Sequence, residues 1–200
     1  MKTKHLILAS ASPRRVQLLQ QIQIEFKQQA ADIDESCREG ETAEAFVCRL
    51  AQEKARHICN KTNDKQAVVL GCDTIVVVDE HILGKPADYQ DAVKMLTLLS
   101  ARTHQVMTAV TLISEKASKT RLSISEVRFM PLSQHLIEAY WQTGEPQGKA
   151  GAYAIQGIAG QFIEKINGSY SAIMGLPLYE TRRLLEEAGF ELLGSTLHNK

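Results

Sequence analysis

The chain has 200 residues, of which 44% are hydrophobic, and its 23 Lys and Arg residues balance 23 Asp and Glu residues. This composition is typical of a globular protein and excludes a largely disordered chain. The net charge is zero, whereas a protein that mainly binds nucleic acid usually has an excess of basic residues. No apolar run reaches the roughly 18 residues of a transmembrane helix. We expect one α/β domain over residues 1–200, with the last roughly ten residues as a flexible tail.

A strand, a loop and a helix are predicted at the start of the chain. Residues 5–10 form a short apolar run, after which Ser12 suits the N-cap of a helix and Pro13 its first position. A second helix is expected from Thr42, because apolar residues recur at helical spacing beyond it. The stretch between the two helices, residues 31–36, is acidic.

A long β-branched run follows in the middle of the chain. Residues 67–79 predict one strand, or two strands joined by a kink at Gly71–Thr74. A turn then leads to a helix for which Asp88 is the expected cap. Residues 104–114 and 121–129 predict two further strands.

The last third of the chain combines helices with glycine-rich segments. A helix is predicted over residues 133–143, and the concentration of glycine in residues 148–175 predicts tight turns. Within that segment we expect strands at residues 152–155 and 161–166. The last helix is expected over residues 177–189, with a proline at its start and a glycine at its end.

The cysteines and histidines show no metal-binding pattern. The six histidines are scattered without ligand spacing, and no cysteine pair has the C-x-x-C form of zinc sites and redox motifs. We therefore expect reduced thiols in a cytoplasmic protein. The four cysteines are Cys37, Cys48, Cys59 and Cys72.

Three positions depart from the local sequence patterns, and such departures often mark function. The first is the pair Arg14 and Arg15, which places two cations in the first turn of a helix, where the macrodipole disfavours them. A bound anion such as a phosphate would offset this penalty. The alternative is that both side chains extend into solvent.

The second departure is Lys54, which lies on the apolar stripe of the helix that begins at Thr42. Leu50, Ala51 and Ile58 share this stripe, so Lys54 points toward the core side. Its ammonium group either reaches back to the surface along its aliphatic stem or meets a buried anion beside a cleft.

The third departure is Asp73, a carboxylate inside the most hydrophobic stretch of the chain. An unpaired buried charge is costly, so Asp73 needs a partner, a metal or a place at the end of the sheet. A carboxylate at a strand end is a common place for catalysis, and an aspartate in a kinked turn is the alternative. Lys85, in the turn after the same strand, could reach the same end of the sheet as Asp73.

Several short blocks along the chain carry a family resemblance. They are Leu8–Arg15, Glu53–Ala55, Gly71–Thr74, Gly84–Pro86, Thr103–Thr108, Gly151–Gly157, Lys165–Tyr170 and Gly175–Pro177. In this order the blocks resemble the Maf family of nucleotide pyrophosphatases, over residues 5 to 190. Several independent blocks in one order are far more specific than any single block.

The resemblance implies a fold and a reaction. The implied fold is like that of the inosine triphosphatases, with an elongated mixed β-sheet flanked by helices and two lobes around a central cleft. The implied reaction is hydrolysis of a nucleoside triphosphate between the α and β phosphates. Asp73 matches the family's general base, and Glu35 matches a carboxylate linked to metal and substrate binding. The phosphate-contacting positions are matched by Ser10, Arg14, Arg15, Lys54 and Lys85.

The resemblance also bears on the substrate. Arg14, Thr74 and Gln156 stand at the positions that separate the branches of the family, and all three resemble the branch that acts on dTTP and UTP. The branch that prefers 7-methyl-GTP usually has tryptophan, glutamine and glutamate there. Cys72 departs from the alanine that is common among close relatives, and a thiol beside Asp73 could make activity sensitive to oxidation.

A divalent metal cation, Mg²⁺ or Mn²⁺, is the implied cofactor, because it would offset triphosphate charge and polarise the phosphoryl group. Glu35 and Asp73 are its expected oxygen ligands. The expected partner is the nucleoside triphosphate, with no nucleic acid and no membrane. Members of the family are often dimers, and Tyr140 or Trp141 could serve such an interface.

Two alternatives to dTTP and UTP hydrolysis are open at this point. One is the same reaction on a modified purine nucleotide such as 7-methyl-GTP. The other is a regulator of cell division that binds nucleotide or nucleic acid without hydrolysis. The neutral charge balance argues against nucleic acid, and the intact Asp73 argues against a catalytically inactive sensor.

Overall fold

The computed structural model describes residues 4–193, and these form two compact units. Of the described residues, the first unit holds those up to Asp73, Thr108–Ser123 and those from Gly175 onward. The second unit holds Thr74–Met107 and Ile124–Met174. Three long strands, β3, β5 and β6, have residues in both units. Of the last ten residues, predicted as a flexible tail, 194–200 lie outside the described residues.

The seven strands of the described residues form one mixed sheet in the order β2-β1-β3-β5-β6-β7, with β4 paired to β3. Strand β1 runs parallel to β2 and β3, whereas β4 is antiparallel to β3 and β7 is antiparallel to β6. This confirms the expected mixed sheet flanked by helices; the cleft stays a prediction. The strands are β1 (His5–Ala9), β2 (Phe26–Gln28), β3 (Ala67–Val78), β4 (His81–Leu83), β5 (Thr103–Ile113), β6 (Ser118–Phe129) and β7 (Ile163–Asn167).

The helices that the sequence predicted begin at or directly after the residues expected as their starts. The side chains of Thr42, Asp88 and Ser133 each accept a hydrogen bond from a backbone N–H in the first turn of α2, α3 and α4. Ser12 precedes α1 as predicted, but its side chain makes no capping hydrogen bond. The helices are α1 (Pro13–Gln21), α2 (Ala43–Lys61), α3 (Tyr89–Leu99), α4 (Gln134–Gln142), α5 (Tyr170–Met174) and α6 (Leu178–Glu187), with 3-10 helices η1 (Ala150–Ala152) and η2 (Ile158–Phe162).

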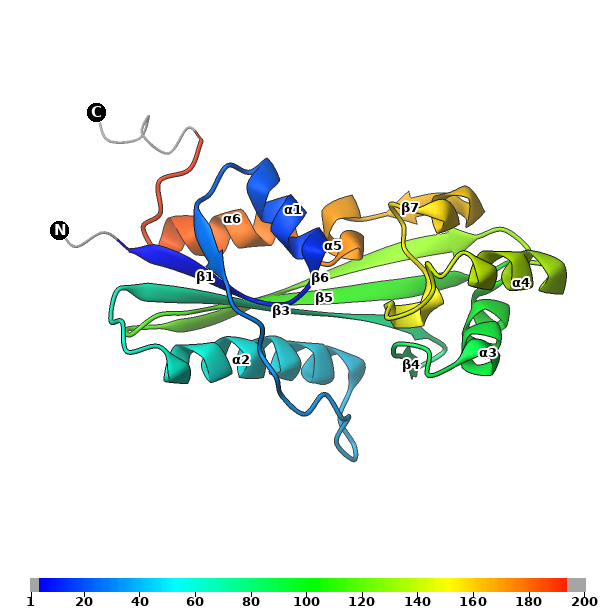
Figure 1. The fold of residues 1–200 in the computed structure, drawn as a ribbon, viewed down its shortest axis with the longest axis horizontal. Helices are drawn as coiled ribbons and strands as arrows, with labels where there is room; N and C mark the ends of the chain where they lie inside the picture. Colours follow the sequence, from blue (N-terminus) through cyan, green and yellow to red (C-terminus); the bar gives the residue numbers. More distant parts are fainter. Residues whose placement is uncertain (1–3, 194–200) are drawn as a thin grey trace. The chain divides into compact units, whose positions relative to one another are not determined.

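In the first unit, helices cover both faces of the strands. Figure 1 shows α2 on one face and α1 and α6 on the other. Side chains alternate along β1, so Ile7 and Ala9 point to one face, where they pack in one cluster with Ala55 and Ile58 of α2. Leu8 points to the opposite face and is fully buried. This alternation decides which strand residues can reach α2.

The second unit has its own aromatic core. The ring of Phe162 packs edge-on against the rings of Phe129 and Tyr140, with centroid distances of 6.3 and 5.1 Å. Tyr140 is only 2% exposed, because it lies one turn after the buried Ile137 on the inner face of α4, and its hydroxyl donates to Glu145. The suggestion that Tyr140 serves a surface interface is therefore wrong.

Several elements differ from the sequence-based expectation. The run of residues 67–79 forms one continuous strand rather than two strands joined by a kink. Residues 152–155 are not a strand, because the chain turns through η1, where Gly151 has a φ of 66°. Strands β2 and β4 and helix α5 were not predicted, since three to five residues are too few to show a hydrophobic period.

Within residues 4–193, no helix is long and apolar enough to cross a membrane.

Candidate active site

Asp73 lies in the middle of β3, not at a strand end as one interpretation of the sequence proposed. Side chains alternate along the strand, so Asp73 shares a face with Val69 and Gly71. Val69 packs in the same cluster as Ala55 and Ile58 of α2. The carboxylate of Asp73 therefore points toward α2, and the residue is 7% exposed.

Helix α2 approaches β3 very closely at Gly71. A Cβ atom on Gly71 would lie 2.3 Å from the carbonyl oxygen of Ala51 and 2.7 Å from the backbone nitrogen of Ala55. The absence of a side chain lets the helix backbone lie directly on the strand. Lys54 lies on the same helix face, and its Nζ donates to Oδ1 of Asp73 over 2.6 Å. Lys54 therefore meets a buried anion, as one interpretation of the sequence proposed, and the cleft beside it stays a prediction.

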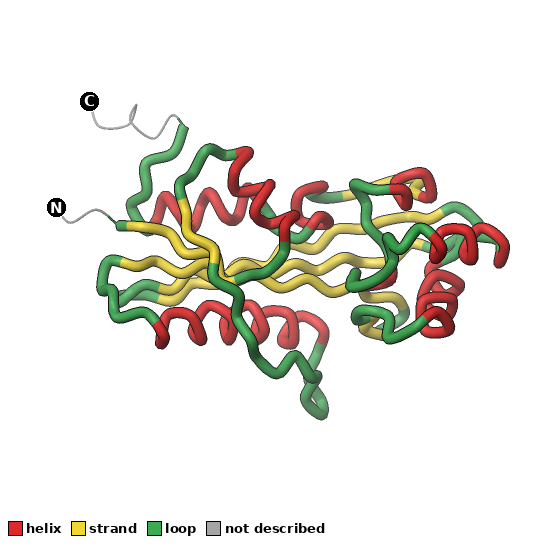
Figure 2. Tube along the Cα trace, viewed as in Figure 1, coloured by secondary structure: helices red, strands yellow, loops and turns green. Residues whose placement is uncertain are grey.

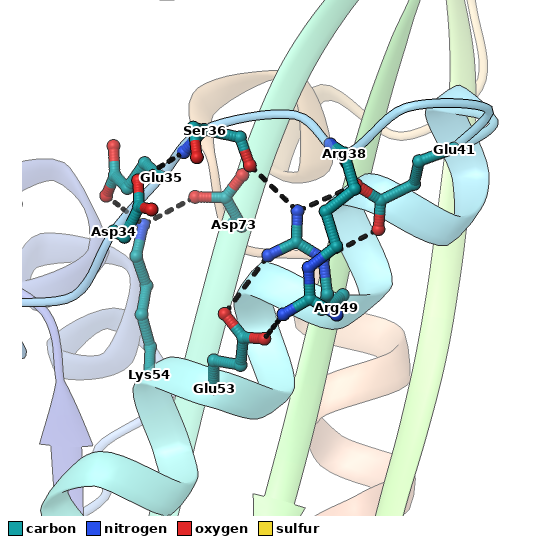
Figure 3. A network of polar contacts seen from close by, with 9 residues as sticks. All are labelled: Asp34, Glu35, Ser36, Arg38, Glu41, Arg49, Glu53, Lys54 and Asp73. Carbon is teal, nitrogen blue, oxygen red and sulfur yellow. Dashed lines mark hydrogen bonds and ion pairs between the residues drawn. The ribbon is translucent and has the colours of Figure 1, made fainter.

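Glu35 lies on the long loop that joins β2 to α2 (Figure 2). Together with Lys54 and Asp73 it forms what we call the acidic cluster. Its Oε1 lies 2.6 Å from Nζ of Lys54, so one ammonium group lies between two carboxylates (Figure 3). The side chains of Lys54 and Asp73 are 9% and 10% exposed, whereas that of Glu35 is 41% exposed. The cluster is therefore open to solvent on the Glu35 side.

This cluster has the donor chemistry of a divalent cation site. The two carboxylates that converge on the Lys54 ammonium supply oxygen ligands, which hard cations prefer. In residues 4–193, no group of three or more His, Cys, Asp or Glu side chains is placed to hold a metal ion. Magnesium sites that handle phosphates commonly use one or two carboxylates, with phosphate oxygens and water as the other ligands. Glu35 and Asp73 fit that pattern.

Ser10 and Arg15 form a second cluster at the start of α1. Nη1 of Arg15 donates to the Ser10 hydroxyl oxygen over 3.2 Å, and Nε donates to the carbonyl oxygen of Gly175 over 2.8 Å. The backbone N–H of Ser12 also donates to the Ser10 hydroxyl, at 3.1 Å. Two donors therefore orient the Ser10 oxygen. The alternative that both N-terminal arginines extend into solvent is wrong for Arg15.

Arg14 lies beside Arg15 in the first turn of α1 and is half-buried. Burial, followed by repulsion from Arg15, lowers the pKa of Arg14 from its ordinary value. A bound anion would relieve both effects, because its charge would stabilise the partly buried Arg14 cation and offset the repulsion between Arg14 and Arg15.

Cys72 belongs to the opposite face of β3 from Asp73. Its Sγ lies 3.1 Å from the carbonyl oxygen of Gly175, the same oxygen that accepts from Arg15. Burial raises the pKa of the Cys72 thiol to about 11, so the group is protonated near neutral pH. Since the thiolate is the reactive form, the structure argues against the expected sensitivity of Cys72 to oxidation.

The other three predicted site residues, Thr74, Lys85 and Gln156, belong to the second unit. Lys85 is exposed in the turn after β4, and the carbonyl of the preceding Gly84 accepts a hydrogen bond from Gly151 over 3.0 Å. This bond joins the Lys85 turn to the glycine-rich segment that carries Gln156. Gln156 itself is exposed.

Glu145 holds the segment that carries Gln156. Its carboxylate accepts hydrogen bonds from the backbone N–H groups of Ile158 and Ala159, at 2.8 and 3.1 Å. A Cβ atom on Gly157 would lie 2.1 Å from Oε2 of Glu145, so only glycine allows this approach. The backbone beside the proposed specificity residue is therefore fixed by a carboxylate that sequence reasoning did not single out.

Sequence reasoning also missed Arg49 and Glu41, which lie next to the acidic cluster (Figure 3). Arg49 donates from Nε and Nη2 to the two carboxylate oxygens of Glu41, at 2.6 and 2.7 Å. The side chains are only 14% and 10% exposed. In the sequence Arg49 stands four residues before Glu53, a spacing that usually indicates an ordinary surface ion pair on a helix.

The mixed sheet, its flanking helices and the partly buried cluster of Glu35, Lys54 and Asp73 define an α/β protein with an enzyme-like polar site. The model of the family described as "Maf-like protein" matches residues 5–188, and the chain belongs to this family. The family resemblance seen in the sequence blocks is thereby confirmed.

The chain is similar to several proteins named dTTP/UTP pyrophosphatase. That of Colwellia psychrerythraea is 51% identical, with 99% of this chain and 93% of the relative covered. That of Photobacterium profundum is 52% identical, with 90% and 95% covered, and that of Hahella chejuensis is 49% identical, with 94% of each covered. Among solved structures, protein VC0702 from Vibrio cholerae aligns over 70% of each chain with a TM-score of 0.35 and 11% identity, which supports no conclusion.

Proposed function

We propose that the chain hydrolyses dTTP and UTP between the α and β phosphates and releases the nucleoside monophosphate and pyrophosphate. Relatives that are 49–52% identical over at least nine tenths of their length are named for dTTP and UTP. The structural observation that carries the proposal is the buried Asp73, which is ion-paired with Lys54. The exposed Glu35 side chain contacts the same ammonium group, so this site borders solvent.

Asp73 is the residue that we assign to the attacking water. Its Oδ1 accepts the hydrogen bond from Lys54, which fixes the orientation of the carboxylate, and Oδ2 is the oxygen assigned to the water. A carboxylate in this position orients the water toward the α phosphorus and accepts its proton as the new P–O bond forms. The pyrophosphate group then leaves with the electrons of the broken P–O bond.

Glu35 and Asp73 are the residues that we propose to hold a divalent cation, Mg²⁺ or Mn²⁺. When bound, such a cation would offset phosphate charge and polarise the phosphoryl group. A carboxylate that ligates a metal is a weaker base, so in that state Asp73 acts more by positioning the water. When Glu35 and Asp73 bind the cation, the Lys54 ammonium group would contact them less and could donate to a phosphate oxygen.

The remaining cations are proposed to bind the triphosphate. Arg14 is suited to a bidentate contact, because it is half-buried beside a second cation at a helix N-terminus. Arg15 acts on Ser10, whose hydroxyl oxygen it orients. Lys85 is also proposed to contact the phosphates.

Base selection is proposed to depend on Arg14, Thr74 and Gln156. The amide of Gln156 offers both a donor and acceptors, which can pair with the polar edge of a pyrimidine. A base that covers these groups without hydrogen-bonding to them is penalised, since the groups then lose water without gaining a partner.

A panel of nucleoside triphosphates tests this proposal. Pyrophosphate release is measured with dTTP, UTP, the other canonical triphosphates and 7-methyl-GTP, each with Mg²⁺ and with Mn²⁺. We expect dTTP and UTP to give the highest kcat/KM and Asp73→Asn to abolish turnover while the circular dichroism spectrum is unchanged. A preference for 7-methyl-GTP, or nucleotide binding without hydrolysis under any condition, would overturn it.

We also propose a cytoplasmic location and leave the homodimer as a prediction. The four cysteines are free thiols, and Cys37 among them is exposed, which fits a reducing compartment.

A further inference from the structure

Arg49 of α2 binds the loop that carries Glu35 at two points. Arg49 uses its Nη2 to donate to the carbonyl oxygen of Ser36 over 2.9 Å, directly after Glu35 in the chain. The same guanidinium binds Glu41, near the other end of the loop, through the two short hydrogen bonds of 2.6 and 2.7 Å. Arg49 therefore holds both sides of the segment from Glu35 to Glu41 (Figure 3).

Further hydrogen bonds support the attachment. Glu41 also accepts from the backbone N–H of Arg38 over 3.1 Å, which closes the loop on itself. Glu53 of α2 accepts from Nη1 of Arg49 at 3.1 Å and from Nη2 of Arg38 at 2.9 Å. The favourable contact of Glu41 with Arg49 lowers the pKa of that carboxyl to about 2, so the pair is ionised at neutral pH.

Geometry links this attachment to the acidic cluster. Arg49 and Lys54 both belong to α2, so the helix that supplies the ammonium also anchors the loop that supplies the exposed carboxylate. Glu35 reaches Lys54 from a loop segment whose next peptide carbonyl is bound by Arg49. Loss of that anchor would remove the hydrogen bond that holds the backbone next to Glu35 against α2.

We infer that Arg49 and Glu41 act together as a positioning pair that holds Glu35 opposite Asp73 and so sets the affinity of the site for its divalent cation. This inference rests on the proposed cation site at Glu35 and Asp73, and only its kinetic consequence rests on the proposed hydrolysis. Residues that orient a metal ligand commonly change metal affinity by about 10- to 100-fold when they are replaced.

The test compares Arg49→Lys, which keeps the charge but loses the forked geometry, with Arg49→Met and Glu41→Gln. The control is Glu187→Gln, which weakens contacts to two other cations, Lys119 and Arg121, on elements that carry no site residue. Direct Mn²⁺ binding, measured by electron paramagnetic resonance on the full chain, needs no activity. We expect the Kd for Mn²⁺ to rise at least tenfold in Arg49→Met, less in Arg49→Lys, and not at all in the control.

Amide hydrogen exchange supplies a second readout. In Arg49→Met, residues 34–41 should exchange at least tenfold faster, whereas β1 and β3 should keep their protection. With a hydrolysed substrate, the Mn²⁺ concentration for half-maximal rate should rise while kcat at saturating Mn²⁺ stays within threefold. Unchanged Mn²⁺ affinity in both Arg49 variants, or unchanged exchange of this loop, would overturn the inference. A wild-type chain without hydrolysis would instead overturn the proposed function, and the binding and exchange results would still decide the inference.

Discussion

Lys54 and Asp73 form an ion pair of 2.6 Å between α2 and β3, with about nine tenths of each side chain removed from solvent. Burial of two charges is costly, and their attraction offsets this cost only when both partners are present. The pair is therefore a point where folding stability and the proposed chemistry depend on the same two side chains.

We predict that Lys54→Met destabilises the protein by about 3 kcal/mol, because it leaves the Asp73 carboxylate buried without its cation. The double variant Lys54→Met with Asp73→Leu removes both charges and should recover most of that loss without recovering pyrophosphate release. Urea denaturation monitored by circular dichroism measures both. If Lys54→Met alone were as stable as the wild type, the ion pair would not be what allows the Asp73 carboxylate to be buried.

Gly71→Ala should destabilise the protein by about 1–3 kcal/mol and lower activity. The added methyl group would overlap backbone atoms of Ala51 and Ala55, so α2 would have to move away from β3 and take Lys54 with it. Gly84→Ala is the control, since an added Cβ there meets nothing within 4 Å. Thermal denaturation of the two variants gives the comparison; equal midpoints would refute the close-approach argument.

Cys72 should be inert to alkylation in the folded protein. Burial and the raised pKa keep its thiol protonated, whereas Cys37 is exposed. Treatment with iodoacetamide at neutral pH, followed by peptide mass spectrometry, should label Cys37 first and Cys72 only after denaturation. Labelling of both at one rate would contradict the burial of Cys72.

His104 should make the protein less stable in acid. Burial lowers the pKa of His104 to about 4, against about 6.5 in an unfolded chain, so the unfolded state binds the proton more readily. The contribution of neutral His104 is fully present above pH 6.5 and is lost as the pH falls toward 4. The full loss is on the order of 3 kcal/mol.

His104→Gln isolates this effect, because glutamine can still form a hydrogen bond with the hydroxyl of Tyr153, the partner of His104 at 2.8 Å. The free energy of unfolding, measured in urea between pH 4 and pH 7, should vary less with pH in this variant. The exposed His81→Gln is the matched control. The same pH slope in His104→Gln and wild type would assign the acid sensitivity to other groups.

Glu145→Ala should weaken substrate binding more than turnover. Loss of the carboxylate leaves the N–H groups of Ile158 and Ala159 without their acceptor and loosens the segment that carries Gln156. We expect KM for dTTP and UTP to rise about tenfold, which corresponds to about 1.4 kcal/mol, with a smaller change in kcat. Glu138→Ala, at an exposed glutamate of α4, is the control. An unchanged KM would separate Glu145 from base recognition.

The sequence by itself determined most of the elements and the identity of the candidate residues. Hydrophobic period and capping residues located α2, α3 and α4, because these are local properties of neighbouring residues. Lys54 and Asp73 were marked by the conflict between their charge and their apolar surroundings. The family resemblance implied Glu35, which no local pattern singles out.

Only the tertiary structure decided how these residues meet. The close approach of α2 at Gly71 brings Lys54 to Asp73, and the path of a long irregular loop brings Glu35 to the same ammonium group. Arg49 and Glu41 show the same limit, since a helical Arg with a nearby Glu in the sequence resembles any surface pair. Contacts between separate elements depend on packing distance and loop path, which local sequence patterns do not encode.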